Sequence, residues 1–204
     1  SVVFAVNTEN GEGPKTIEDF FDTEKFPGKR GLRKRPQVNM EWALLADGVA
    51  PEEVYEVLAT EEGQAQAFAK LDTIKDEITW YDSWSQAPVL LNDGGATMVQ
   101  SANGRIFAAI KDDGAPFEIV WDSHIYDLDV WAIMKGTEKK EEAMEFIKFA
   151  TGTVPLSGMQ DVAYGPTRAS AQALLPEEVK KDLPTAHLDE GVKADGIFWA
   201  DYGC

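Results

Sequence analysis

The stretch ATMVQSANGRIFAAIKDDGAPFEIVW, residues 96–121, decides the fold class. Residues 96–100 form a short apolar run of the length expected for a buried strand, and residues 103–112 carry apolar side chains at helical spacing. Gly114 and Pro116 end this helix, and residues 117–121 form a second apolar run. A strand, a helix and a strand in succession predict an α/β architecture.

The same alternation extends toward both ends of the chain. Threonines stand where helix N-caps are expected, at Thr16, Thr60 and Thr137. The pattern predicts further strands at 2–6, 78–81 and 126–134, and further helices at 17–22, 38–46, 52–58, 86–91 and 138–150. We therefore expect an α/β fold with a mostly parallel sheet.

Composition excludes several classes of partner. The 204 residues include 36 acidic and 19 basic side chains, a net charge of −17. Nucleic acid and anionic membrane surfaces are disfavoured, because phosphates are bound by clustered Lys and Arg. The single cysteine, Cys204, allows no intrachain disulfide. The sequence begins on an apolar strand without a signal peptide, which indicates a cytoplasmic protein, a mature form or a fragment.

Known catalytic and cofactor motifs are missing from the sequence. The two histidines, His124 and His187, lack metal-ligand spacing, and there is no GxSxG, Walker or GxGxxG motif. We therefore expect no metal and no cofactor.

Asp127 and Asp129 are the most informative carboxylates. In the expected strand their i, i+2 spacing would direct both side chains to one face. Three interpretations remain open: a solvated strand end, capture of an amine or guanidinium by charge-assisted hydrogen bonds, or a catalytic acid-base pair.

Aromatic and basic side chains provide two further candidate features. The aromatic residues are core residues or a wall that holds an organic cation or an alkyl chain; they are Trp80, Tyr81, Trp84, Trp121, Tyr126 and Trp131. The basic run from Lys29 to Arg35 holds five of the 19 basic residues. It is either a solvated loop or a site for a carboxylate or phosphate.

Short segments along the whole chain resemble the polyamine-type (spermidine/putrescine-like) periplasmic solute-binding proteins of ABC transporters. The matching segments are PKT (14–16), DFFD (19–22), FPGKR (26–30), SANGR (101–105), IYDLDVWAI (125–133), KEEA (140–143), FI (146–147), YGPT (164–167) and WADYG (199–203). Their order and spacing make the resemblance specific.

The resemblance implies two α/β lobes, joined by strand crossovers, with the ligand in the cleft between them (a type II periplasmic-binding-protein-like fold). Residues 1–121 would be the second lobe with its first hinge strand, and residues 122–131 the return crossover. Residues 132–204 would belong to the first lobe, of which most is missing. The aromatic tail from Ile197 to Tyr202 looks unfinished, because too little chain follows to cover it. We therefore expect the chain to be a fragment.

The resemblance also implies ligand-binding residues. Asp129 matches the family's acidic residue that binds a ligand amine, whereas Asp127 and Ala102 stand where members usually carry aromatics. Around Arg33 to Val38, the acids that polyamine binders carry are absent. Arg35 and Arg105 acting with Asp129 would suit a ligand with an amine and an acidic group. The candidate ligand-binding residues are Asp129, Asp127, Tyr126, Arg35, Arg105, Asn103, Trp80 and Trp84.

The expected function is that of a non-catalytic, periplasmic substrate-binding component of an ABC importer, for a polyamine-like or amino-acid-like solute. Its expected partners are that small molecule and the membrane permease subunits, with no nucleic acid. Two alternatives are a small α/β enzyme with an Asp127/Asp129 acid-base pair and a sensing module that binds its ligand without transport.

Overall fold

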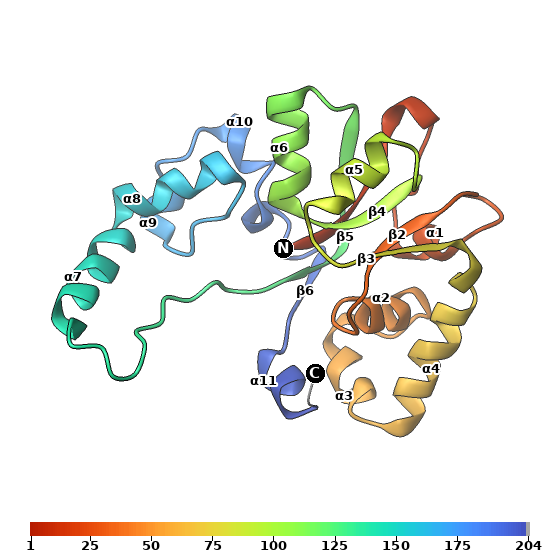
Figure 1. Cartoon of the computed structure of the whole chain (residues 1–204), viewed down its shortest axis with the longest axis horizontal. Coiled ribbons are helices and arrows are strands. Elements are labelled where there is room, and N and C mark those ends of the chain that lie inside the picture. Colours follow the sequence, from red (N-terminus) through yellow and green to blue (C-terminus); the bar gives the residue numbers. More distant parts are fainter. Residues whose placement is uncertain (203–204) are drawn as a thin grey trace. The chain divides into compact units, whose positions relative to one another are not determined.

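Six strands form one mixed sheet in the structure, a computed structural model that describes residues 1–202 (Figure 1). The order is β3-β2-β4-β1-β5-β6. The strands are β1 (Val2–Asn7), β2 (Arg30–Arg33), β3 (Ile78–Tyr81), β4 (Met98–Ala102), β5 (Phe117–Tyr126) and β6 (Gly191–Lys193). β2 runs parallel to β3 and β4, and β5 to β6, whereas β1 is antiparallel to β4 and β5. The expected mostly parallel sheet is therefore mixed.

The chain forms two units. The large unit contains Ser1–Tyr126 and the C-terminal residues from Asp189, and the small unit contains Asp127–Leu188. The large unit holds the whole sheet. This division differs from the expected domain boundaries at residues 189–202, which pack with residues 1–126.

Helices cover both faces of the sheet in the large unit. One face packs against α1 (Ile17–Phe21), α2 (Asn39–Ala46), α3 (Val54–Leu58) and α4 (Glu61–Asp72). The other face packs against α5 (Gln86–Asn92) and α6 (Asn103–Asp113). Phe4 and Leu32 face the first layer and Ala5 and Val99 the second, because successive strand residues point to opposite faces. Short 3₁₀ turns lie at Thr8–Asn10, Pro51–Glu53, Lys75–Glu77, Gly158–Val162 and Pro184–Ala186.

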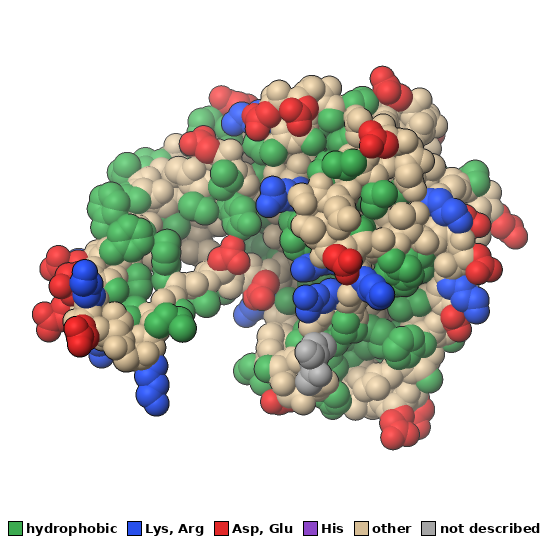
Figure 2. Space-filling view, viewed as in Figure 1, with side chains coloured by type: hydrophobic (Ala, Val, Ile, Leu, Met, Phe, Trp, Pro, Cys, Tyr) green, Lys and Arg blue, Asp and Glu red, His purple; other side chains and the backbone are tan. Residues whose placement is uncertain are grey.

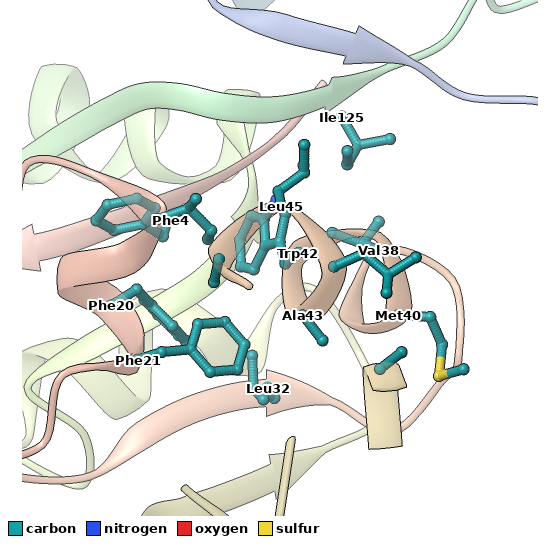
Figure 3. Packing of buried hydrophobic residues seen from close by; sticks show 14 of the residues in the cluster. Phe4, Phe20, Phe21, Leu32, Val38, Met40, Trp42, Ala43, Leu45 and Ile125 are labelled. Carbon is teal, nitrogen blue, oxygen red and sulfur yellow. The ribbon is translucent and has the colours of Figure 1, made fainter. Parts of the chain in front are cut away.

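Three aromatic rings form the centre of the larger core (Figure 3). The Phe4 ring lies 5.4 Å from that of Phe20 and 6.1 Å from that of Trp42, and the Phe20 and Trp42 rings lie 5.5 Å apart. Trp42 also donates its indole N–H to the Ser123 carbonyl over 2.9 Å. The one polar atom of this ring cluster is thus satisfied within the core.

Arg30 is fully buried, and its guanidinium is surrounded by backbone carbonyl oxygens. Nε donates to Phe20 O at 3.0 Å, Nη1 to Gly28 O at 2.5 Å, and Nη2 to Asp22 O and Phe26 O at 3.0 and 2.6 Å. These bonds tie the loop after α1 to the first residue of β2.

The small unit is helical and lacks a large core of its own. Its helices are α7 (Lys140–Ala150), α8 (Thr153–Ser157), α9 (Ala169–Gln172) and α10 (Glu177–Lys180). α7 has no buried residue, although its sequence is amphipathic. Large apolar side chains are exposed, including Val130, Trp131, Met134, Met144, Phe146, Phe149 and Val154. None of the helices between residues 1 and 202 has the length and apolar character that crossing a membrane requires.

Most of the predicted elements are confirmed, including the capping roles of Thr16 and Thr60, whose hydroxyls accept from Asp19 N and Gly63 N. The predicted cap at Thr137 is wrong, because α7 begins at Lys140 and the Thr137 hydroxyl accepts from Lys139 N, outside the helix. The strand predicted at 126–134 is wrong. β5 ends at Tyr126, and the residues beyond it are irregular. Pairing with β6 ends at Lys193, so extended backbone beyond Tyr126 has no neighbouring strand.

The aromatic tail has a partner, contrary to the sequence-based expectation. It forms α11 (Gly196–Asp201), which begins at Asp195, whose side chain accepts from Ile197 N and Phe198 N. The Phe198 ring lies 5.4 Å from that of Tyr55, and Trp199 Nε1 donates to Glu41 Oε1 over 2.8 Å. The tail therefore packs on α2 and α3. Gly203 and Cys204 lie outside the described residues.

Glu41 is a buried carboxylate that links three helices. Besides Trp199 it accepts from Tyr55 Oη at 3.1 Å and from Val38 N at 2.7 Å. Burial raises the pKa of Glu41 above its ordinary value of 4.5, although these three donors oppose the shift.

β5 and β6 approach closely at Gly191, which pairs with His124. A Cβ atom at residue 191 would lie 2.4 Å from His124 Nε2 and 2.7 Å from its carbonyl oxygen. Only glycine permits this contact, because real Cβ atoms do not come so near to other heavy atoms.

Replacing Arg30 tests the carbonyl cage. Arg30→Met leaves buried acceptors without donors, so we expect a loss of about 3 kcal/mol or more in unfolding free energy. The control is Lys29→Met, which removes the exposed Lys29–Glu77 pair and should cost about 1 kcal/mol or less. Urea unfolding measures both, and equal losses would contradict the structural role of Arg30.

Glu41 should make stability depend on pH. Because its folded pKa is raised, its contribution is fully present below 4.5 and is lost as pH rises through the folded pKa. The unfolding free energy of the wild type minus that of Glu41→Gln should therefore fall with rising pH, by up to about 1.4 kcal/mol per unit. Glu56→Gln, which removes an exposed carboxyl from α3, is the matched control. A difference that rises with pH would contradict the argument.

Candidate functional site

One edge of the sheet gathers the polar ends of several strands. β2, β3 and β4 are parallel, so their carboxyl ends lie at the same edge. Val2 pairs with Ala102 and with Ile125, which places the start of β1 and the end of β5 at this edge too. Open α/β sheets bind ligands outside the carboxyl ends of their strands. We call this the binding edge.

Two buried amides hold the binding edge together. Gln100 Nε2 donates to Asn39 Oδ1 over 2.8 Å, and Gln100 Oε1 accepts from Arg33 N at 3.1 Å. Asn39 Nδ2 donates to Arg33 O and Arg35 O at 2.9 and 2.8 Å. Tyr81 Oη donates to the Gln100 carbonyl oxygen, and burial raises the pKa of this hydroxyl, which keeps it a donor. β2, β3, β4 and α2 thus share one polar network.

The loop that leads into α2 is strained at its last residue. Val38 has φ 72°, a left-handed conformation that is costly for a β-branched side chain. Its N–H is held by Glu41 Oε2, and the following residue is Asn39 of the amide network. The surrounding bonds therefore fix the course of residues 33–38, as is common at functional sites.

Arg33 is the last residue of β2 and lies over an aromatic ring. Its guanidinium carbon is 4.5 Å from the centre of the Trp84 ring, and Nε donates to Asp82 O at 3.1 Å. The Trp84 ring in turn lies 6.3 Å from that of Tyr81. Arg33 is thus held on both its backbone and its side chain.

Four cations near this edge lack a carboxylate partner. Within residues 1–202, ion pairs involve other lysines, and none includes Arg33, Lys34, Arg35 or Arg105. Figure 2 shows Lys and Arg side chains gathered near the ends of β2 and β3. These four side chains are therefore the candidates at this edge for contact with an anion.

The basic run therefore has two parts. Lys29 pairs with Glu77 over 3.1 Å, and Arg30 is buried in its carbonyl cage. Residues 30–33 form β2, so the run is a strand that ends in a loop rather than a loop throughout. Only its last three residues contribute cations to the binding edge.

Five of the predicted site residues lie at the binding edge. Arg35 is exposed after β2, and Trp84 follows β3. Asn103 is buried at the start of α6, where its N–H donates to Ser1 O at 3.1 Å, and Arg105 is exposed in the first turn. Tyr126 ends β5, with its ring 5.6 Å from that of His124.

The remaining predicted site residues are Trp80, Asp127 and Asp129. Trp80 is 49% exposed within β3 and points to the opposite face from its buried neighbour Tyr81, so the predicted aromatic set is not one wall. Asp127 and Asp129 are exposed residues of the small unit. Asp127 Oδ1 accepts from Leu128 N at 2.7 Å. The prediction that both aspartates share a strand face is wrong, because the segment is irregular.

Sequence reasoning did not find Asn39 or Gln100, and it included Arg33 only as a member of the basic run. One signal was present: Gln100 has a long polar side chain in a strand that begins with Met98 and Val99, and buried polar groups require partners. No comparable signal pointed to Asn39, which is one residue in a buried helix.

Comparison with known proteins defines the class. A family model described as bacterial extracellular solute-binding protein matches residues 1–185. The chain therefore belongs to the bacterial extracellular solute-binding protein family. This confirms the solute-binding class and the fold expected from the sequence.

Individual relatives refine the picture. The gamma-aminobutyric acid-binding protein of Pseudomonas aeruginosa is 44% identical over the whole chain, which covers 58% of that protein. A solved structure described as the Atu4243-GABA receptor is 34% identical, with a TM-score of 0.86, over 99% of this chain and 62% of that one. MotA from A. tumefaciens B6, solved with glucopine, is 32% identical, with a TM-score of 0.85, over 98% and 64%. The chain thus spans about three fifths of these relatives.

A structure described as a putative spermidine/putrescine ABC transporter from Listeria monocytogenes is 18% identical, with a TM-score of 0.72, and shares the fold alone. The relatives are solute-binding proteins rather than enzymes. The polyamine subclass stays a prediction.

A double-mutant cycle tests the amide network. Asn39→Ala and Gln100→Leu each leave buried polar groups unpaired, and each should cost about 2–3 kcal/mol in unfolding free energy. The double variant should cost less than their sum by about 1 kcal/mol or more. Strict additivity in urea unfolding would show that the two amides are not coupled. Gln66→Ala, which removes a hydrogen bond to Asp47 at the surface, is the control.

Proposed function

We propose that the protein is the periplasmic substrate-binding component of an ABC importer and binds a small solute with one amine and one carboxylate. The observation that carries the proposal is the presence of two exposed arginines without an ion pair, Arg35 and Arg105, at the binding edge of a family member with a net charge of −17. The name of the 44% identical relative supports the same solute class.

Arg105 and Arg35 bind the carboxylate in this proposal. Both are exposed, and neither forms an ion pair within residues 1–202. An arginine fork matches the two oxygens of a carboxylate with parallel hydrogen bonds. Asn103 begins the helix that carries Arg105, and its N–H bond to Ser1 O anchors that turn.

Asp129 binds the amine in this proposal, and Asp127 assists it. Both carboxylates are exposed, and neither forms an ion pair in the part of the chain that the structure describes. Tyr126 and Trp84 offer aromatic faces, which attract an ammonium group or pack on alkyl carbons.

A diamine fits this set of residues less well. Arg35 and Arg105 would repel the second ammonium group of putrescine or spermidine, because like charges at short range raise the energy. An amino acid-like solute avoids this repulsion, because its carboxylate, rather than a second ammonium group, lies beside the arginines.

The large unit is then the second lobe, and the small unit is part of the first. The exposed apolar side chains of α7 support this assignment, because an unpartnered apolar helix face requires a cover. About two fifths of each relative lies outside the match, and equivalent polypeptide would cover this helix face. Solute that engages both lobes shifts the population toward the closed state, which permease subunits recognise.

Calorimetry on the complete protein that carries these residues tests the proposal. γ-Aminobutyrate should bind, whereas putrescine, without the carboxylate, and butyrate, without the amine, should bind about 100-fold more weakly or not at all. Arg105→Gln and Asp129→Asn should each weaken γ-aminobutyrate binding by about 10- to 100-fold, the value of one charge-assisted hydrogen-bonded contact.

Asp161→Asn is the matched control, because Asp161 is an exposed aspartate of the same unit as Asp129. It should leave affinity unchanged. Tight binding of putrescine together with no binding of amino acids would refute the proposal.

A further inference from the structure

We propose that Arg33, held on Trp84, forms a second anion subsite at the binding edge and recognises a further carboxylate of the solute. This inference rests on the proposed function. It extends the solute class from one acidic group to two.

Arg33 is held in position by contacts within the protein. Its backbone N–H and C=O are both bound by the buried amides of Gln100 and Asn39. Its guanidinium lies on the Trp84 ring, and Nε is held by Asp82 O. Little side-chain entropy is left to lose on binding, and preorganisation of this kind favours affinity.

The free donors of Arg33 have the geometry for a planar anion. The guanidinium carries five N–H groups, of which Nε–H is engaged with Asp82 O. The Nη groups make no hydrogen bond within residues 1–202, and the only carboxylate-bearing residue joined to this side chain, Asp82, contributes its backbone oxygen. The two Nη nitrogens are therefore available to a carboxylate, which an arginine binds through two oxygens.

Arg33 and Arg105 occupy separate positions along the edge. β2 and β4 are neighbouring parallel strands. Arg33 is the last residue of β2, and Arg105 lies in the first turn of α6, which follows β4. Like charges at one edge raise each other's energy, and a solute with one carboxylate neutralises only one of these two cations. A second carboxylate removes the remaining repulsion.

The contact with the Trp84 ring requires arginine rather than lysine at residue 33. Arginine stacks on an aromatic face through its delocalised plane and still directs its outer N–H groups away from the ring. The contact also fixes where those donors point. The expected ligand class is therefore a small amine with two carboxylates.

The test compares γ-aminobutyrate with three compounds that each carry one further carboxylate and are isomers of one another: glutamate, (aminomethyl)succinate and (2-aminoethyl)malonate. Calorimetry uses the complete protein and its Arg33→Gln, Arg33→Lys and Lys111→Gln variants. At least one isomer should bind the wild type no more weakly than γ-aminobutyrate does. Arg33→Gln should weaken that isomer at least 10-fold and γ-aminobutyrate less than 3-fold, and Arg33→Lys should fall between wild type and Gln.

Lys111→Gln is the matched control. Lys111 Nζ also lies over an aromatic ring, 5.4 Å from the centre of Phe107, but it stands in the last turn of α6, away from the binding edge. This variant should change neither affinity. Retained γ-aminobutyrate binding by Arg33→Gln shows that the variant is folded.

Each outcome separates the two proposals. If γ-aminobutyrate binds and all three isomers bind at least 10-fold more weakly, the second subsite is overturned and the proposed function stands. The same holds if Arg33→Gln weakens the isomers and γ-aminobutyrate equally. If neither γ-aminobutyrate nor any isomer binds the wild type, the proposed function fails, and the second subsite fails with it.

Discussion

The hydrogen bond between the buried amides of Gln100 and Asn39 is the interaction on which the binding edge depends. Each amide uses its remaining capacity on the backbone around Arg33. One side-chain pair therefore sets the end of β2, the loop after it and the start of α2. Because both groups are buried, losing either partner leaves polar atoms in a medium without water, so the pair is far stronger in effect than a single exposed contact.

This arrangement leaves the cations after residue 32 without a carboxylate partner, although the chain is rich in acidic residues. Lys29 and Arg30, earlier in the same basic run, are satisfied by Glu77 and by backbone carbonyls. Beyond residue 32 the backbone is held by amides, which carry no charge. The cations that follow form no ion pair within the described residues. In the proposed site, uncharged amides would hold the backbone in place without neutralising these cations.

Local patterns allowed most of the large unit to be predicted. Thr16 and Thr60 cap helices because their hydroxyls serve orphan N–H groups nearby in sequence. The failures involve partners distant in sequence. Residues 127–134 look like a strand but have no strand beside them, and Trp199 looked uncovered because its partner Glu41 lies 158 residues earlier. The candidate site differs in the same way between local and distant signals. Arg35, Trp84 and Arg105 were predicted as ligand-binding residues, whereas Asn39 was not, because its partner Gln100 lies in β4, 61 residues later.

The close contact at Gly191 limits how the chain can change over evolutionary time. A single methyl group there would press on both the imidazole and the carbonyl oxygen of His124, so shortening residue 124 alone would not make room. We therefore expect glycine to be retained at position 191 as long as β6 pairs with β5. Conversely, Gly191→Ala would loosen the pairing of β5 and β6 without replacing any of the proposed ligand-binding residues.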